Sequence, residues 1–204
     1  MKKVYIVLLA AVLTASYAQA QFTFGLRTGF NLTTMTEEGI DTKMKPGFQI
    51  GVVGDYALSD NFSIQPGVLF ATQGFRWNLS LMGADLKTSI NLNYLQIPVN
   101  AQYKLDLGGM NLLLQAGPYL GYAVSGKVIA KAGGLKEEEK INFGSNKEEM
   151  KAFDFGLGLG AGLQFGNIQA GLGYNIGLAN LSNVEDSSTK NNGLALTVTY
   201  LFGK

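Results

Sequence analysis

The segment Phe153–Phe165, FDFGLGLGAGLQF, decides the fold because its residues alternate strictly in character. Every second residue is apolar, and the residues between them are Asp154, four glycines and Gln164. Successive side chains of a β-strand point to opposite faces, so one face of this segment is apolar and the other small or polar. A helix would scatter the pattern, and the interior glycines would weaken it. The segment is therefore predicted to be a β-strand.

Seven further segments show the same alternation and extend the prediction along the chain. They cover residues 22–32, 48–56, 62–70, 95–103, 112–124, 168–178 and 194–202. Residues 90–94 also alternate, but one residue out of phase with the segment that follows. An extra residue in one strand produces such a shift, so we expect a β-bulge near Tyr94. The chain is predicted to form eight strands.

The second face of these strands determines which side is the interior. It consists mostly of Gly, Ala, Asn, Gln and Thr, whereas a sheet face in water normally carries many charges. Apolar residues outside and polar residues inside are typical of a membrane barrel. Aromatic residues near both strand ends, Phe75, Trp77 and Tyr94 among them, suggest two interfacial girdles. We predict an all-β, eight-stranded antiparallel up-and-down transmembrane β-barrel; the alternative is a secreted, soluble lipocalin-like binder with an apolar cup.

The predicted connections alternate in length. Short turns are expected at residues 59–61, 106–109 and 166–167, and longer polar loops at residues 34–45, 78–86, 127–150 and 180–192. Outer-membrane barrels have short periplasmic turns and longer external loops. An even number of strands then places both ends of the mature chain on the periplasmic side.

Residues 1–20 have the three parts of a secretory signal peptide. Lys2 and Lys3 form a positive start, residues 4–13 are apolar, and small residues precede a cleavage site between Ala20 and Gln21. Residues 21–204 are then the barrel domain. Export to the cell outer membrane implies periplasmic chaperones and the barrel-assembly machinery as transient partners.

The composition argues against several function classes. The chain has 16 basic and 15 acidic residues, so no basic footprint indicates nucleic acid. It contains no histidine and no cysteine, which removes the commonest general base and the thiolate ligands of metals. We expect no enzyme activity, no catalytic residue, no cofactor and no metal site.

Polar residues of the second face are the candidate site residues. We predict a lumen polar network of Arg27, Asp55, Lys104, Asp154, Gln115 and Gln164, accompanied by Gln49 and Gln65. Such residues could line a proton or solute path, but eight strands leave little bore, so a network that fills the lumen is preferred. By register, Arg27 and Asp55 lie near opposite ends, and a direct pair between them is not expected. The charge cluster at residues 136–140 is interpreted as a solvated external loop, with a cation-bridged lipopolysaccharide contact or a ligand-binding loop as alternatives.

Three stretches resemble a known family. They are residues 93–99, NYLQIPV, with Tyr94, Leu95, Ile97 and Pro98; the glycine-rich residues 154–162; and the terminal residues 195–202. Together with the signal peptide they resemble the PorT-like, porin-like outer-membrane β-barrel family common in Bacteroidetes. The resemblance implies the fold and the location. The family's founding member is tied to protein secretion across the outer membrane. No residue of this chain supports assigning that role to it.

The function expected from these features is a structural or interaction role at the outer membrane, exerted by surface loops above a filled lumen. Expected partners are outer-membrane lipid, lipopolysaccharide and an unidentified surface ligand or protein. A narrow channel, or an accessory of secretion or transport, is the alternative from another class.

Overall fold

The computed structural model describes residues 21–36, 42–81, 84–132, 135–147, 149–184 and 187–203. The predicted signal peptide, including Ala20, lies outside these residues, and Gln21 is the first residue described. The described residues form the strands β1 (Phe22–Thr36), β2 (Lys43–Ala57), β3 (Phe62–Leu81), β4 (Ala84–Asp106), β5 (Asn111–Ala132), β6 (Leu135–Lys140), β7 (Phe153–Phe165), β8 (Ile168–Gly177) and β9 (Lys190–Leu201). No helix among them is long and apolar enough to cross a membrane.

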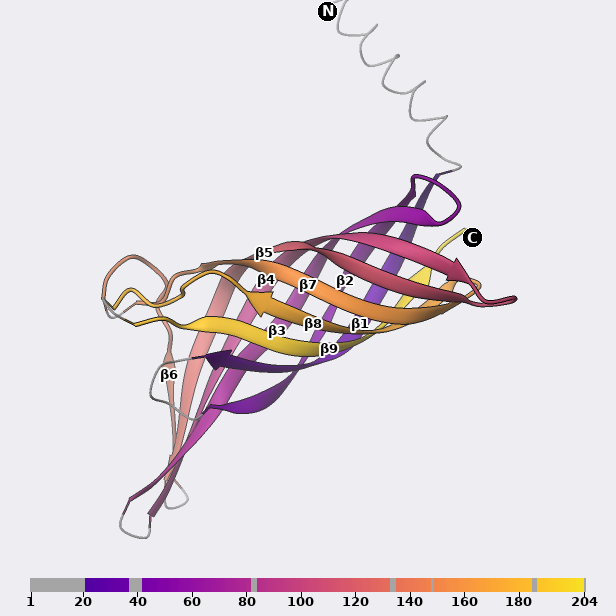
Figure 1. The fold of residues 1–204 in the computed structure, drawn as a ribbon. Coiled ribbons are helices and arrows are strands. Elements are labelled where there is room, and N and C mark those ends of the chain that lie inside the picture. The colour runs from indigo at the N-terminus through magenta and orange to yellow at the C-terminus, as the bar shows by residue number, and fades with distance from the viewer. Residues whose placement is uncertain are drawn as a thin grey trace, which may run out of the picture.

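Eight of these strands close into a ring. Neighbours along the chain pair antiparallel from β1 to β5, β7 pairs with β5, and the order continues through β8 and β9. The ring closes where β9 pairs with β1, from Gly25–Leu201 to Thr36–Lys190. Closure gives each strand of the ring a partner on both sides, which a barrel in lipid requires because lipid offers no hydrogen bonds. The predicted eight-stranded up-and-down barrel is confirmed (Figure 1).

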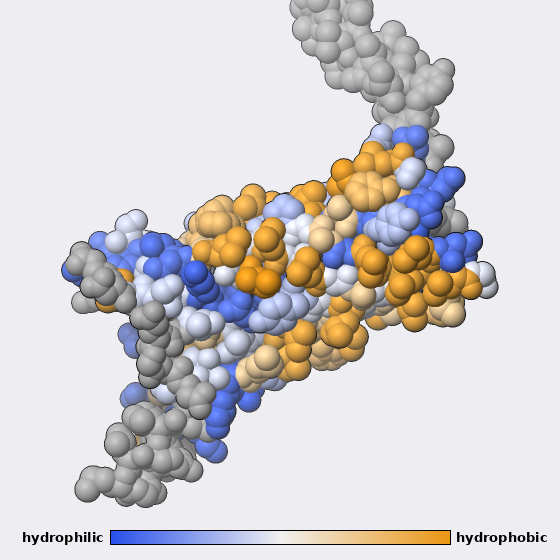
Figure 2. All heavy atoms as spheres, in the orientation of Figure 1, coloured by the Kyte–Doolittle hydropathy of each residue, from blue (hydrophilic) through white to orange (hydrophobic). Residues whose placement is uncertain are grey.

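The barrel is apolar outside and polar inside. Leu26 and Phe30 on β1 are 52% and 72% exposed, whereas Arg27 between them is 6% exposed. Figure 2 shows apolar residues over much of the visible outer wall, between more hydrophilic residues at the two ends. This sidedness is opposite to that of a soluble lipocalin-like cup, so that alternative is wrong. The apolar outer face is the surface that contacts lipid.

The short turns lie at one end of the barrel, together with the start of β1 and the end of β9 (Figure 1). Residues 58–61 connect β2 to β3, residues 107–110 connect β4 to β5, and residues 166–167 connect β7 to β8. Gly108 and Gly109 have φ angles of 76° and 114°, which side-chain-bearing residues rarely adopt. By the rule for outer-membrane barrels, this end is periplasmic and the opposite end is external.

Two of the predicted long loops are wrong in part. Residues 78–81 belong to β3 and residues 84–86 to β4, and these strands remain paired to Leu81–Ala84. Residues 127–132 are the end of β5, and residues 135–140 are β6. Beyond the ring, β3, β4, β5 and β6 therefore form a four-stranded sheet, here called the extension. The charge cluster 136–140 is a strand of the extension and not a loop. Its polar residues gave no alternating apolar signal, and cross-strand pairing supplies the structure instead.

A bulge lies beside Tyr94 as predicted, but its extra residue belongs to β5 and not to β4, and part of the aromatic assignment is wrong. The β4–β5 register shifts between Asn93 and Tyr94. The extra residue is Val124 of β5, and β3 and β4 each keep one phase throughout. Tyr94 therefore faces inward like Gln96, and Phe75 faces inward like Gln73, and the two residues are 1% and 2% exposed. Trp77 stacks on Phe75, with ring centroids 5.4 Å apart. These three aromatics pack inside the external end and do not form a lipid-facing girdle.

Candidate functional site: the filled lumen

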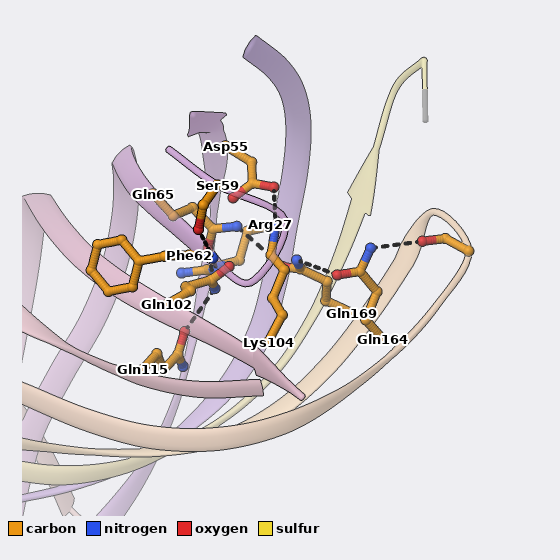
Figure 3. A network of polar contacts seen from close by, with 11 residues as sticks. Arg27, Asp55, Ser59, Phe62, Gln65, Gln102, Lys104, Gln115, Gln164 and Gln169 are labelled. Carbon is orange, nitrogen blue, oxygen red and sulfur yellow. Dashed lines mark hydrogen bonds and ion pairs between the residues drawn. The ribbon is translucent and has the colours of Figure 1, made fainter. Parts of the chain in front are cut away.

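Arg27 is the centre of a network that crosses the lumen (Figure 3). Its Nε atom donates a hydrogen bond to Thr199 Oγ1 at 2.9 Å, and its Nη2 atom donates to Gln65 Oε1. Gln65 is 1% exposed, so both partners hold the guanidinium inside the protein. Burying a charged group is costly unless it is hydrogen-bonded, and these contacts meet that requirement in part.

A series of glutamines extends this network around the wall. Gln102 Nε2 donates to Gln65 Oε1 at 3.1 Å and to Gln115 Oε1 at 3.2 Å. In the other direction, Gln65 Nε2 donates to Gln169 Oε1 at 3.1 Å, and Gln169 Nε2 donates to Gln164 Oε1 at 3.3 Å. With Arg27 and Thr199, the network draws on β1, β3, β4, β5, β7, β8 and β9. Side chains from opposite walls therefore meet inside the barrel.

Asp55 and Lys104 form an ion pair near the periplasmic end. The Lys104 Nζ and Asp55 Oδ2 atoms are 3.0 Å apart, and both residues are buried. Asp55 is on β2 and Lys104 is on β4, so the contact passes across the inside of β3. The structure thus gives Asp55 a lysine partner from a non-adjacent strand.

Asp154 lies apart from the Arg27 network. Asn191 Nδ2 donates to Asp154 Oδ2 at 2.9 Å and to Tyr94 Oη at 3.3 Å. All three residues are buried. The six predicted lumen residues therefore fall into three groups: the network containing Arg27, Gln115 and Gln164, the Asp55–Lys104 pair, and Asp154 with Asn191.

An apolar cluster fills the external end of the lumen. Its buried members are Met35, Phe75, Leu92, Tyr94, Ala123, Ala179 and Leu181, and Ile141, Phe143, Met150 and Ala152 pack against them. Ile141, Phe143, Met150 and Ala152 thus lie over the external end of the barrel. The lumen is filled by polar side chains below and by apolar side chains above.

The remaining cavities in the lumen are small. The one lined by Arg27, Gln49 and Gln96 has a volume of about 50 Å³, and two others have volumes of about 10 Å³ each. A water molecule needs roughly 10–15 Å³ on this measure. These spaces fit a few water molecules but no larger solute. Within the described residues, no three acidic side chains converge to hold a metal ion.

Several network residues were absent from the prediction. Gln102, Gln169, Thr199 and Asn191 also occupy inward positions, and the same alternation that singled out Gln115 marks Gln102 and Gln169. Their pairing could not be derived, because strand order does not give the height of each side chain along the lumen. The four family-motif residues divide between the two faces. Tyr94 and Pro98 point inward, and Leu95 and Ile97 are 43% and 44% exposed on the outer face.

Comparison with known proteins agrees with this architecture. A family model described as "outer membrane protein beta-barrel domain" matches residues 17–183. The chain belongs to this family. Its location is accordingly the cell outer membrane. A search of curated proteins found no match.

Three solved structures are similar to this family member. Neisserial surface protein A is 15% identical, with a TM-score of 0.44, and the match covers 87% of this chain and 96% of that one. The attachment invasion locus protein Ail of Yersinia pestis is 16% identical, with a TM-score of 0.42 and coverages of 89% and 99%. OprG of Pseudomonas aeruginosa is 12% identical, with a TM-score of 0.44 and coverages of 90% and 97%.

Proposed function

We propose that this outer-membrane barrel is a filled, non-catalytic protein that acts through its external surface and conducts no solutes. The observation that carries the proposal is the hydrogen-bonded network around Arg27, which joins side chains from seven of the eight ring strands across the lumen. The apolar cluster, which lies closer to the external end, fills the lumen at a second level. Passage of a solute would require both groups to separate.

Conductance in a planar bilayer tests this proposal. The mature chain should show no steady openings after reconstitution. A variant with Arg27→Ala, Gln65→Ala and Gln102→Ala should show more frequent brief openings, because it removes the side chains that cross the lumen. The control variant carries Leu26→Ala, Ile64→Ala and Tyr103→Ala, which change the lipid-facing sequence neighbours of Arg27, Gln65 and Gln102. The barrel of this control should stay closed. Steady large openings of the unaltered protein would refute a filled barrel.

A second part of the proposal concerns the subgroup of the family to which the chain belongs. We propose a place in the PorT-like subgroup, supported by the motif Tyr94, Leu95, Ile97 and Pro98 in β4 and by the glycine-rich β7. We propose common ancestry with this subgroup and do not propose a role in secretion. It includes export by a signal peptide at residues 1–20 and assembly by periplasmic chaperones and the barrel-assembly machinery. Blocking signal cleavage with Ala18→Leu and Ala20→Leu should leave a precursor of higher mass.

A further inference from the structure

The extension has one strongly basic face. This face of the extension is continuous with the outer face of the barrel. Seven exposed lysine and arginine residues lie on it. They are called the basic face here and are Lys43, Arg76, Lys87, Lys127, Lys131, Lys136 and Lys140. The acidic residues Glu137 and Glu139 alternate with the lysines of β6 and therefore point to the opposite face.

Like charges lie directly opposite each other on this face. Lys43 pairs with Arg76, and Lys127 pairs with Lys140. Lys131 pairs with Lys87 on one side and with Lys136 on the other, so three lysines form a row. Like charges at directly opposite positions destabilise a sheet. An anion bound between them would remove this repulsion.

The protein itself neutralises only part of this charge. Among the described side chains of the face, Glu138 is the one carboxylate, and its oxygens lie 3.1 Å from Lys127 Nζ and 2.5 Å from Lys136 Nζ. Hydrogen bonds from Lys136 and Lys127 lower the pKa of Glu138, so it is ionised at neutral pH. Within the described chain, no carboxylate lies at ion-pair distance from Arg76, Lys87 or Lys131.

Two adjacent hollows lie on the basic face. One has a volume of about 600 Å³ and is lined by residues that include Lys43, Lys45, Arg76, Lys87 and Lys131. The other has a volume of about 410 Å³ and shares Lys45 and Asn91 with the first, adding Lys127 and Lys140. Ser89, Asn93 and Ser125 supply neutral hydrogen-bonding groups. These hollows are much larger than the lumen cavities, and their lining suits a phosphorylated headgroup.

The basic face continues directly from the lipid-facing wall. Phe70, Leu95 and Tyr122 are paired, exposed and apolar, and a polar row of Thr72, Asn93 and Ser125 follows. Lys127 pairs with Asn91, four residues beyond Leu95, or about 13 Å along the strand. The cations therefore begin where the headgroups of the outer leaflet are expected.

The position of the extension favours the same partner. Figure 1 shows the extension projecting beyond the external end of the ring, at an angle to the long axis of the barrel. In Figure 2, hydrophilic residues cover the visible base of the extension beside the barrel wall. Because the basic face continues from the lipid-facing wall, its base lies beside the lipid headgroups, whereas a soluble molecule would have to approach from outside.

We propose that the basic face binds the phosphate groups of an outer-leaflet glycolipid, holding one headgroup in the hollows at the base of the extension. Lysine and arginine bind phosphate by charge and by hydrogen bonding, and Arg76 can form two parallel bonds to it. Bound phosphate relieves the repulsion within the rows of like charge. This site is independent of the lumen and of whether the lumen conducts.

Lipid binding to the folded mature chain tests the site. The protein, in a zwitterionic detergent, is titrated with bis-phosphorylated lipid A, and bound lipid is counted by native mass spectrometry. The unaltered protein should retain lipid A with an affinity that falls as salt rises. The variant Arg76→Gln, Lys87→Gln, Lys131→Gln should bind roughly a hundredfold more weakly, since each cation contributes roughly fivefold near a charged surface.

The matched control removes three charges elsewhere on the external side. It carries Lys147→Gln, Lys151→Gln and Lys190→Gln and should bind lipid A as the unaltered protein does. Heat-modifiable gel migration verifies that each variant is folded. Equal affinity of the Arg76 triple variant and the unaltered protein would overturn the proposal.

Two further measurements need no variant. Lipid A without its phosphates should bind far more weakly to the unaltered protein, and equal binding would show that phosphate is not recognised. Inorganic phosphate at matched concentration should displace little lipid A. Complete displacement would assign the face to soluble anions and refute the lipid site.

Discussion

The substitution Leu196→Arg measures whether the apolar face contacts lipid. Leu196 is 59% exposed at the centre of β9, and it pairs with Phe30 of β1 and Leu172 of β8, which are 72% and 57% exposed. These three side chains form one apolar patch on the outer wall. In water such a patch would accept an arginine easily, whereas in hydrocarbon the charge would lose its hydration.

The position of Leu196 gives the size of the effect. It lies four residues from Tyr200, about 13 Å along a strand that tilts by about 40°, and so about 10 Å above the periplasmic aromatic level. The apolar band is about 25 Å tall, which places Leu196 near its middle. Arginine at that depth costs about 3 kcal/mol, roughly a 150-fold change in the unfolding equilibrium constant.

Equilibrium unfolding in guanidinium from phosphatidylcholine vesicles measures this change. Trp77, the single tryptophan, reports unfolding by fluorescence because it packs on Phe75 in the native state. Leu135→Arg is the matched control, since Leu135 is 78% exposed on β6, outside the ring. It should change the free energy of unfolding by less than about 0.5 kcal/mol. A Leu196→Arg cost equally small, or a Leu135→Arg cost equally large, would refute the assigned sidedness.

Three further substitutions examine the lumen and the basic face. Arg27→Met should lower the free energy of unfolding by about 2 kcal/mol, because its buried acceptors lose a charged donor; unchanged stability in the same assay would contradict the network's importance. Gly51→Ala places a Cβ atom 2.1 Å from the Val68 carbonyl oxygen, so the folded fraction on heat-modifiable gels should decrease. A Cβ atom at Gly171 would lie 3.4 Å from its nearest neighbour, so Gly171→Ala should leave the folded fraction unchanged. Glu138→Gln should leave the free energy of unfolding nearly unchanged but tighten lipid A binding several-fold, because it releases two lysines; weaker binding would count against the phosphate site.

The lumen shows where prediction from sequence fails. Alternation identified Arg27, Asp55 and Lys104 as inward residues, and all three are buried. It did not identify the ion pair between Asp55 and Lys104, because that contact joins β2 to β4 across the strand between them. Strand tilt and register set the height of each side chain in the bore, and neither quantity can be read from one strand alone.

The sequence by itself determined the all-β fold, the eight strands of the ring and the outward direction of the apolar face. Each of these depends on a period of two along single strands, which is a local property. Only the tertiary structure decided that β3 to β6 continue as an extension, that Phe75 and Tyr94 turn inward, and that seven cations share one face. Those features arise from pairing between strands distant in sequence, where register, and not composition, decides which side chains become neighbours.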